Sequence, residues 1–132
     1  MSEPSFDQAL ALEILHQIHW STQTIQKRFA PIDSPDDFLD SDEGLEKLDA
    51  ICMQFIALGE SLKNLDKVTV GHLLPQYPQI EWKKVMGMRD VISHHYFDLN
   101  AELVYNTCKT HVATLADVVS QMIDKVERDS HL

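Results

Sequence analysis

The sequence predicts an all-α fold, in which four main helices form an antiparallel bundle joined by short helical turns within a single domain, residues 1–132. Apolar residues recur every three or four positions over long stretches, and no strand-like alternation of apolar and polar residues competes with this pattern. A chain of 132 residues, 44% of them apolar, is long enough to bury a continuous core without disulfides or a structural metal.

The first helix is expected over residues 6–29. Its apolar stripe consists of residues three or four positions apart: Phe6, Leu10, Ile14, Ile18, Ser21, Ile25 and Phe29. The helix should end before Pro31, because proline disfavours helical geometry in the residue that precedes it.

An acidic segment follows at residues 33–46, with seven acidic side chains and no basic one. Ser34 and Pro35 predict an N-cap and the first position of a short helical turn. Asp40 and Glu43 predict a capping box for the next helix. The segment fits either a solvated loop whose acids favour helix N-termini or a contact surface for a basic partner.

The second helix, residues 45–65, is apolar over a wider arc than a single stripe provides. One stripe follows alternating steps of three and four and comprises Leu45, Leu48, Cys52, Phe55, Gly59 and Leu62. On an adjoining face, Ile51, Leu58 and Leu65 recur at every seventh position. Such a helix either lies at the centre of the bundle or faces the core on one side and a second subunit on the other.

The rest of the chain predicts two more main helices. Residues 66–80 contain two prolines and a glycine, which indicate an irregular connection with one helical turn. A third helix is expected over residues 81–92, and a break over residues 93–99. Asn100 is a good N-cap for the last helix. The buried stripe of that helix is expected to comprise Val104, Cys108, His111, Val112, Leu115, Val118, Val119, Met122 and Val126.

The charge distribution argues against generic binding to nucleic acid, because the formal net charge is −10. This charge is uneven, however. Residues 61–97 carry five basic and three acidic side chains, a net +2, so the remaining 95 residues carry −12. A site that needs only a few phosphate contacts is therefore compatible with the sequence, and Lys83 and Lys84 are candidates for those contacts.

Several kinds of reactive site are disfavoured. Glu13, His16 and His19 lie at neighbouring positions of the first helix, but a di-iron bundle needs a second Glu-x-x-His, which the sequence lacks. Cys52 and Cys108 fall on apolar stripes and indicate buried thiols in a reducing compartment rather than activated nucleophiles. The sequence contains no Gly-rich phosphate loop, GxSxG or HExxH motif. Neither a metal nor another cofactor is expected.

Arg89, His94 and Tyr96 remain as candidates. If the third helix ends near residue 92, the side chains of Arg89 and His94 can reach one pocket. Histidine can move a proton near neutral pH, and a guanidinium can hold a phosphate as charge builds on it. Without a metal, RNA can be cleaved by its own 2′-OH, which DNA lacks. As a bare pattern, the cluster also fits a structural arrangement at a helix end.

Residues 89–96, Arg-Asp-Val-Ile-Ser-His-His-Tyr, resemble the R-x4-H-x-Y motif of the HEPN superfamily. The context resembles its HepT toxin branch: "IALGESLKNL" precedes the irregular connection, "YPQIEWKKVMGMRD" leads into the motif, and "HHYFDLN" leads out of it. The resemblance covers about residues 10–125.

This resemblance implies a metal-independent endoribonuclease toxin that forms a homodimer or a higher oligomer, with two motifs in one composite cleft. Arg89 and His94 would be the catalytic pair, and Asp90 a polar support. Similar toxins are neutralised by a cognate minimal nucleotidyltransferase antitoxin that transfers AMP to the motif tyrosine, here Tyr96. RNA would be the substrate. His95, between the motif positions, is expected at the pocket edge or in solvent.

Two other functions remain open on the sequence. One is a non-catalytic HEPN module that holds a nucleotide or docks a partner in the same pocket. The other is a metal-binding bundle that uses Glu13, His16 and His19. The sequence contains no long apolar run and no basic region followed by one near its first residue, so a cytoplasmic protein without a membrane partner is expected.

Overall fold

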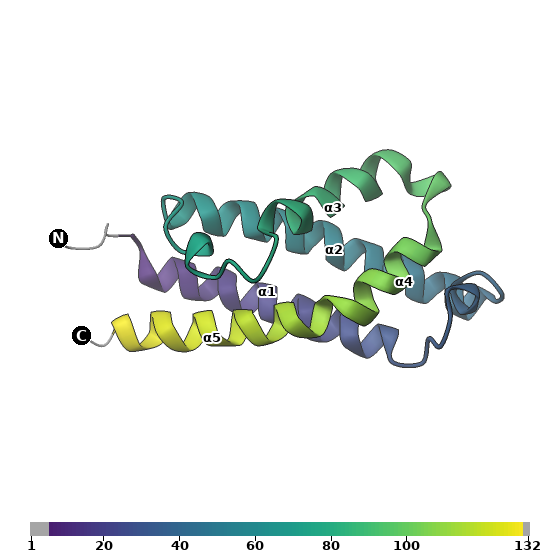
Figure 1. The fold of residues 1–132 in the computed structure, drawn as a ribbon, viewed down its shortest axis with the longest axis horizontal. Helices are drawn as coiled ribbons and strands as arrows, with labels where there is room; N and C mark the ends of the chain where they lie inside the picture. The colour runs from purple at the N-terminus through teal and green to yellow at the C-terminus, as the bar shows by residue number, and fades with distance from the viewer. Residues whose placement is uncertain (1–5, 131–132) are drawn as a thin grey trace.

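The computed structural model describes residues 6–130, apart from the side chain of Phe97. All regular elements in this range are helical, which confirms the predicted all-α class. Five α-helices and three short 3-10 helices follow one another: α1 (Gln8–Phe29), η1 (Pro35–Phe38), α2 (Asp42–Val68), η2 (Leu74–Gln76), α3 (Trp82–His95), η3 (Tyr96–Asp98), α4 (Ala101–Thr110) and α5 (Val112–Ser130). Figure 1 shows α1, α2 and α5 along the long axis of the molecule, with α3 beside α2.

Helix α2 lies at the centre of the bundle. It packs against α1 on one side and α3 on another, while α1 also packs against α5. Ile51, Leu58 and Leu65, the residues of its second apolar face, are completely buried within the chain. Burial of such a side chain contributes about 1.5–3 kcal/mol to folding. The wide apolar arc of α2 therefore serves internal packing, the first of its two interpretations, and does not by itself call for a second subunit.

Helix α1 begins and ends close to its expected limits. The Asp7 carboxylate accepts a hydrogen bond from the Leu10 N–H at 3.0 Å, which satisfies one of the unpaired donors at the helix N-terminus. The helix ends at Phe29, before Pro31, as the sequence predicts. Lys27 and Arg28 lie in its last turn, where their positive charges interact favourably with the negative end of the helix dipole.

The acidic segment forms η1 and the start of α2. The Asp37 carboxylate accepts hydrogen bonds from the backbone N–H groups of Asp33 and Ser34, so the predicted turn after Ser34 is confirmed. The predicted capping box of Asp40 and Glu43 is wrong. Ser41 is the N-cap of α2, because the backbone of Asp40 still belongs to the preceding turn and donates to the carbonyl of residue 36 at 2.9 Å.

Gly44 lets η1 lie directly on the first turn of α2. Its N–H donates to the Ser41 hydroxyl at 3.0 Å. A Cβ at this position would lie 1.9 Å from the backbone oxygen of Asp37. The approach also brings Phe38, which is completely buried, to a ring-centroid distance of 6.4 Å from Phe29.

Helix α3 ends three residues later than expected. It runs through His95 and passes into η3, because no glycine or proline occurs between Gly87 and Asn100 to stop it. The expected break at residues 93–99 is therefore confined to η3 and the two residues that follow.

The expected fourth helix is divided at His111, so the count of four main helices is not confirmed. The Thr107 and Thr110 hydroxyls donate to backbone carbonyls four residues earlier, an arrangement that often bends helices. The break lets α4 pack against η1 while α5 packs against α1. His111 is exposed, so its predicted place in the buried stripe is wrong.

Both cysteines are buried, as the sequence predicts. Burial raises the pKa of Cys52, with a smaller contribution from Asp49, and it also raises the pKa of Cys108; each value is about 12. The two thiols are therefore protonated near neutral pH and are poor nucleophiles. Within the described residues, no helix is long and apolar enough to cross a membrane.

Candidate functional site

The motif of residues 89–96 lies where α3 meets α2. Gly59 of α2 makes this contact close, since a Cβ at this position would lie 3.0 Å from the Arg89 Cβ and 3.2 Å from the Met86 backbone oxygen. A larger residue here would separate the two helices at the position of Arg89. The glycine that the sequence places on an apolar stripe of α2 thus determines how near Arg89 comes to that helix.

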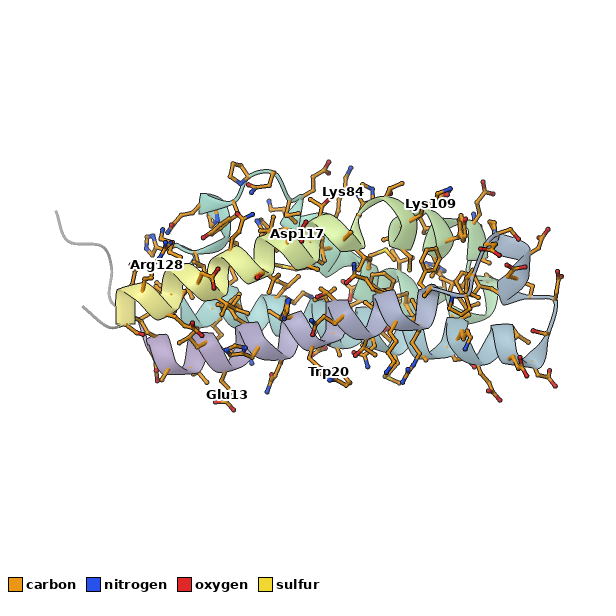
Figure 2. All side chains as sticks on the ribbon, turned by 90° about the horizontal axis from the view of Figure 1, so that it is seen from below. Glu13, Trp20, Lys84, Lys109, Asp117 and Arg128 are labelled. Atoms are coloured by element: carbon orange, nitrogen blue, oxygen red, sulfur yellow. The ribbon has the colours of Figure 1, made fainter. Side chains whose placement is uncertain are left out.

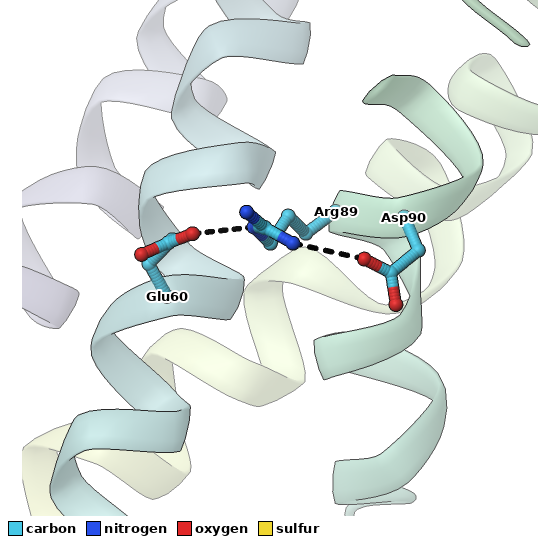
Figure 3. Close-up of polar contacts among 3 residues, drawn as sticks. All are labelled: Glu60, Arg89 and Asp90. Carbon is cyan, nitrogen blue, oxygen red and sulfur yellow. Dashed lines mark hydrogen bonds and ion pairs between the residues drawn. The ribbon is translucent and has the colours of Figure 1, made fainter. Parts of the chain in front are cut away.

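Arg89 is held by two carboxylates. Its Nε forms an ion pair with Glu60 of α2, and its Nη1 donates to Asp90 Oδ1 at 3.0 Å (Figure 3). Glu60, and after it Asp90, raise the pKa of the Arg89 guanidinium, which therefore keeps its charge throughout the physiological range. The side chain is 36% exposed, so it is accessible to a ligand while Glu60 fixes its direction.

Tyr96 contacts α2 in a similar way. Its hydroxyl donates a hydrogen bond to the Asp49 carboxylate. Asp49 and Glu60 are eleven residues apart, so they lie about 20° from one another around α2. Two carboxylates on one face of α2 therefore contact two of the motif side chains, and Tyr96 remains 42% exposed.

His94 does not join Arg89 within the chain. Both residues belong to the continuous helix α3, in which five steps place their side chains about 140° apart. Ile92 is buried, and His94 is exposed at about 160° from it around the helix. The expectation that a helix end near residue 92 would turn His94 toward Arg89 is wrong, because α3 continues to His95, which is also exposed.

Lys83 and Lys84 are also turned away from Arg89. On α3 they lie about 120° and about 140° around the helix from it. Lys84 forms an ion pair with Glu81 at 2.7 Å, which lowers the pKa of Glu81 and raises that of Lys84. Contact of these lysines with RNA phosphates stays a prediction, but any such contact would be away from the Arg89 guanidinium.

The potential metal ligands of α1 do not form a cluster. His16 lies 3.7 Å from a carboxylate oxygen of Glu127 on α5, and Figure 2 shows Glu13 pointing away from the bundle. Within the described part of the chain, no three His, Cys, Asp or Glu side chains are grouped as metal ligands would be. This arrangement gives no support to the alternative of a metal-binding bundle.

Two hollows lie near these helices, one lined in part by α3 and the other by α2 alone. One, of about 370 Å³, is mostly apolar and lies between α3 and the junction of α4 with α5; Val85, Met88 and Leu115 are among its lining residues. The other is polar, of about 320 Å³, and lies on α2. It is lined by Glu60, Ser61, Lys63, Asn64 and Lys67. It therefore shares Glu60 with the contact to Arg89.

Asp49 and Glu60 are the site residues that sequence reasoning missed. Each is one of many exposed acids on an amphipathic helix, and nothing in its immediate surroundings indicates a role. Asp49 and Glu60, eleven residues apart, lie on one face of a helix, and Arg89 and Tyr96, seven residues apart, also lie on one face. Only the two spacings taken together indicate that the acidic pair could contact the motif pair.

Comparison with known proteins gives the family. The family model described as "Ribonuclease HepT-like" matches residues 18–122. The chain belongs to this family. The resemblance to HepT-like proteins of the HEPN superfamily, which the motif predicts, is thereby confirmed.

The individual proteins to which this chain is similar are distant from it. A protein named "Putative RNase" from Methanocaldococcus jannaschii is 29% identical over 92 residues, which cover 70% of each chain. Another of that name, from Caldanaerobacter subterraneus subsp. tengcongensis, is 29% identical over 68 residues, which cover 52% of this chain and 57% of that protein. No solved structure matches the chain.

Proposed function

We propose that this HepT-like protein is a metal-independent endoribonuclease, with Arg89 and His94 as its catalytic pair and Asp90 as a support for Arg89. The observation that carries the proposal is the R-x4-H-x-Y motif, exposed on the last two turns of α3 and the start of η3, in a chain of the HepT-like ribonuclease family. The ion pair with Glu60 and the hydrogen bond to Asp90 fix the position of the guanidinium before a phosphate binds.

In the proposed reaction His94 removes the proton from a ribose 2′-OH. The 2′-oxygen then attacks the adjacent phosphorus, and the bond from phosphorus to the 5′-oxygen of the next nucleotide breaks. That 5′-oxygen leaves and takes a proton from water. Arg89 stabilises the negative charge that builds on the phosphate oxygens during attack. The products are a 2′,3′-cyclic phosphate and a 5′-hydroxyl.

Within one copy of the chain Arg89 and His94 do not face a common cleft, and a second copy can provide the missing side chain. Because Arg89 and His94 diverge by about 140° on α3, a cleft that holds both is most simply built from two copies of α3. Exposed apolar side chains on both helices, Met53 on α2 at 62% and Val91 on α3 at 39%, support contact with a second copy. We therefore propose a homodimer.

Purified protein in a chelating buffer should cleave single-stranded RNA and leave 2′,3′-cyclic phosphate ends, because no step requires a metal. Mass spectrometry of the fragments identifies these ends. The matched control is the same oligonucleotide with 2′-O-methyl ribose throughout, which should stay intact. Cleavage of that control would rule out attack by the 2′-OH. An RNA left intact while a nucleotide binds, and loses affinity in Arg89→Ala, would favour the non-catalytic module.

We also propose that the protein is the toxin of a toxin–antitoxin pair and that a cognate nucleotidyltransferase inactivates it at Tyr96. In that step the Tyr96 oxygen attacks the α-phosphorus of ATP, pyrophosphate leaves, and the hydroxyl proton is lost. The contact of this hydroxyl with Asp49 and its exposed ring support Tyr96 as an acceptor. AMP would add bulk and negative charge about two helical turns from Arg89 and so oppose RNA binding.

Co-expression with the proposed cognate nucleotidyltransferase should increase the intact mass of this chain by one or more AMP units. The increase should be absent in Tyr96→Phe. Tyr105→Phe is the matched control, because the Tyr105 hydroxyl instead donates to the carbonyl of Asp33 at 2.8 Å, away from the motif. A mass increase that persists in Tyr96→Phe would assign the modification to another residue.

A further inference from the structure

The face of α2 that carries Glu60, the partner of Arg89, extends along the helix toward its C-terminal end. Counted from Glu60, which holds Arg89, the side chains of Lys63, Asn64 and Lys67 lie within about 60° around α2. They occupy the next two turns toward the C-terminal end of the helix. A ligand that contacts Arg89 can therefore extend along these residues without crossing α2 or α3.

The surface of this face suits a phosphate backbone. Its hollow of about 320 Å³ is lined entirely by polar or charged side chains, from Glu60 to Lys67. Lys63 and Lys67 are exposed and lie one helical turn apart. The carboxylate of Glu60 is engaged by Arg89, and Asp66 lies about 120° from Glu60 around the helix. Positive charge therefore predominates here in a chain whose net charge is −10.

We infer that Lys63, Asn64 and Lys67 bind the phosphates of RNA on one side of the bond that is cleaved. This inference rests on the proposed ribonuclease function. Lysines hold phosphates as point charges, and the Asn64 amide can donate to a phosphate or ribose oxygen. A ligand bound along this face is also steered into the acidic molecule by a local field of the right sign.

This face of α2 differs from the side of α3 that carries Lys83 and Lys84. Those two lysines lie about 120° and about 140° around α3 from Arg89, and Lys84 is paired with Glu81. Lys63 and Lys67, in contrast, share a hollow with the residue that holds Arg89. Both pairs can be neutralised in the same way, so they form matched variants.

The test is the salt dependence of RNA binding. A labelled, mixed-sequence, single-stranded 2′-O-methyl RNA serves as the probe, because it binds without being cleaved. Each phosphate contact adds about 0.7 to the slope of log affinity against log salt concentration for a single strand. Lys63→Gln with Lys67→Gln should therefore lower the slope by about 1.4 and weaken binding about 25-fold at 0.1 M salt, with little difference from wild type near 1 M.

Lys83→Gln with Lys84→Gln should lower the slope by less, and far-UV circular dichroism should show both double variants folded. An unchanged slope in the Lys63 and Lys67 variant, or a larger decrease in the Lys83 and Lys84 variant, would overturn the inference. If wild-type protein cleaves unmodified RNA in these experiments, the proposed function survives that result. If wild-type protein neither binds the probe nor cleaves RNA, both proposals fail together.

Discussion

His94→Ala should lower the rate of RNA cleavage by about a hundredfold to ten-thousandfold. This range is what a positioned acid–base group contributes to a proton-transfer step. Alanine removes the ring that accepts the 2′-OH proton and leaves Arg89, with its contacts to Glu60 and Asp90, unchanged. The measurement is the single-turnover rate on a labelled RNA, with enzyme in excess over substrate.

His95→Ala is the matched control for this experiment. Both histidines are exposed on the last turn of α3, so their loss should affect helix stability equally, but only His94 holds the motif position. His95→Ala should keep a rate within about threefold of wild type, since a surface substitution rarely changes stability by more than about 0.5 kcal/mol. Equal losses of rate in the two variants would remove His94 from the reaction.

Gly44→Ala should lower the free energy of unfolding by about 3 kcal/mol or more, which exceeds the usual effect of a single substitution. The new methyl group would lie 1.9 Å from the backbone oxygen of Asp37. A change of side-chain rotamer cannot relieve a clash with a backbone atom. Segment η1 would have to move away, and buried Phe38 would move with it. Urea denaturation measures the change directly, and the melting temperature should fall by roughly 10 °C.

Gly87→Ala provides the comparison for Gly44→Ala. Gly87 lies inside α3, and a Cβ there would meet nothing within 4 Å. Alanine is better than glycine in a helix interior by up to about 1 kcal/mol, so this variant should be slightly more stable than wild type. A Gly44→Ala protein of wild-type stability would show that η1 does not rest on α2 in solution.

The sequence predicts most of the helices because their apolar periodicity is local. The end of α1 follows from Pro31, a residue whose effect depends only on its neighbours. Boundaries without such residues are less certain. The sequence predicts the end of α3 three residues too early and gives no sign of the break at His111, since no glycine or proline marks either position.

The candidate site was predictable only in part. The motif residues can be found because they are close in sequence, within 89–96. Their partners Asp49 and Glu60 cannot, because each is separated from its motif residue by at least 29 positions and is brought there by the packing of α3 on α2. The direction of the His94 side chain likewise depends on whether α3 continues beyond residue 92. The five-residue spacing of Arg89 and His94 does not reveal this.

The packing of α3 has a consequence for how the motif is kept in order. Helix α3 packs mainly on α2, whereas α1 has large contacts with both α2 and α5. The motif therefore lies on a helix with comparatively little internal support, where local unfolding costs less free energy than in the core. A partner that binds the outer side of α3 stabilises that helix against local unfolding by its binding free energy. Association and local order are thus thermodynamically linked, and protein concentration can set the fraction of molecules in which the motif is rigid.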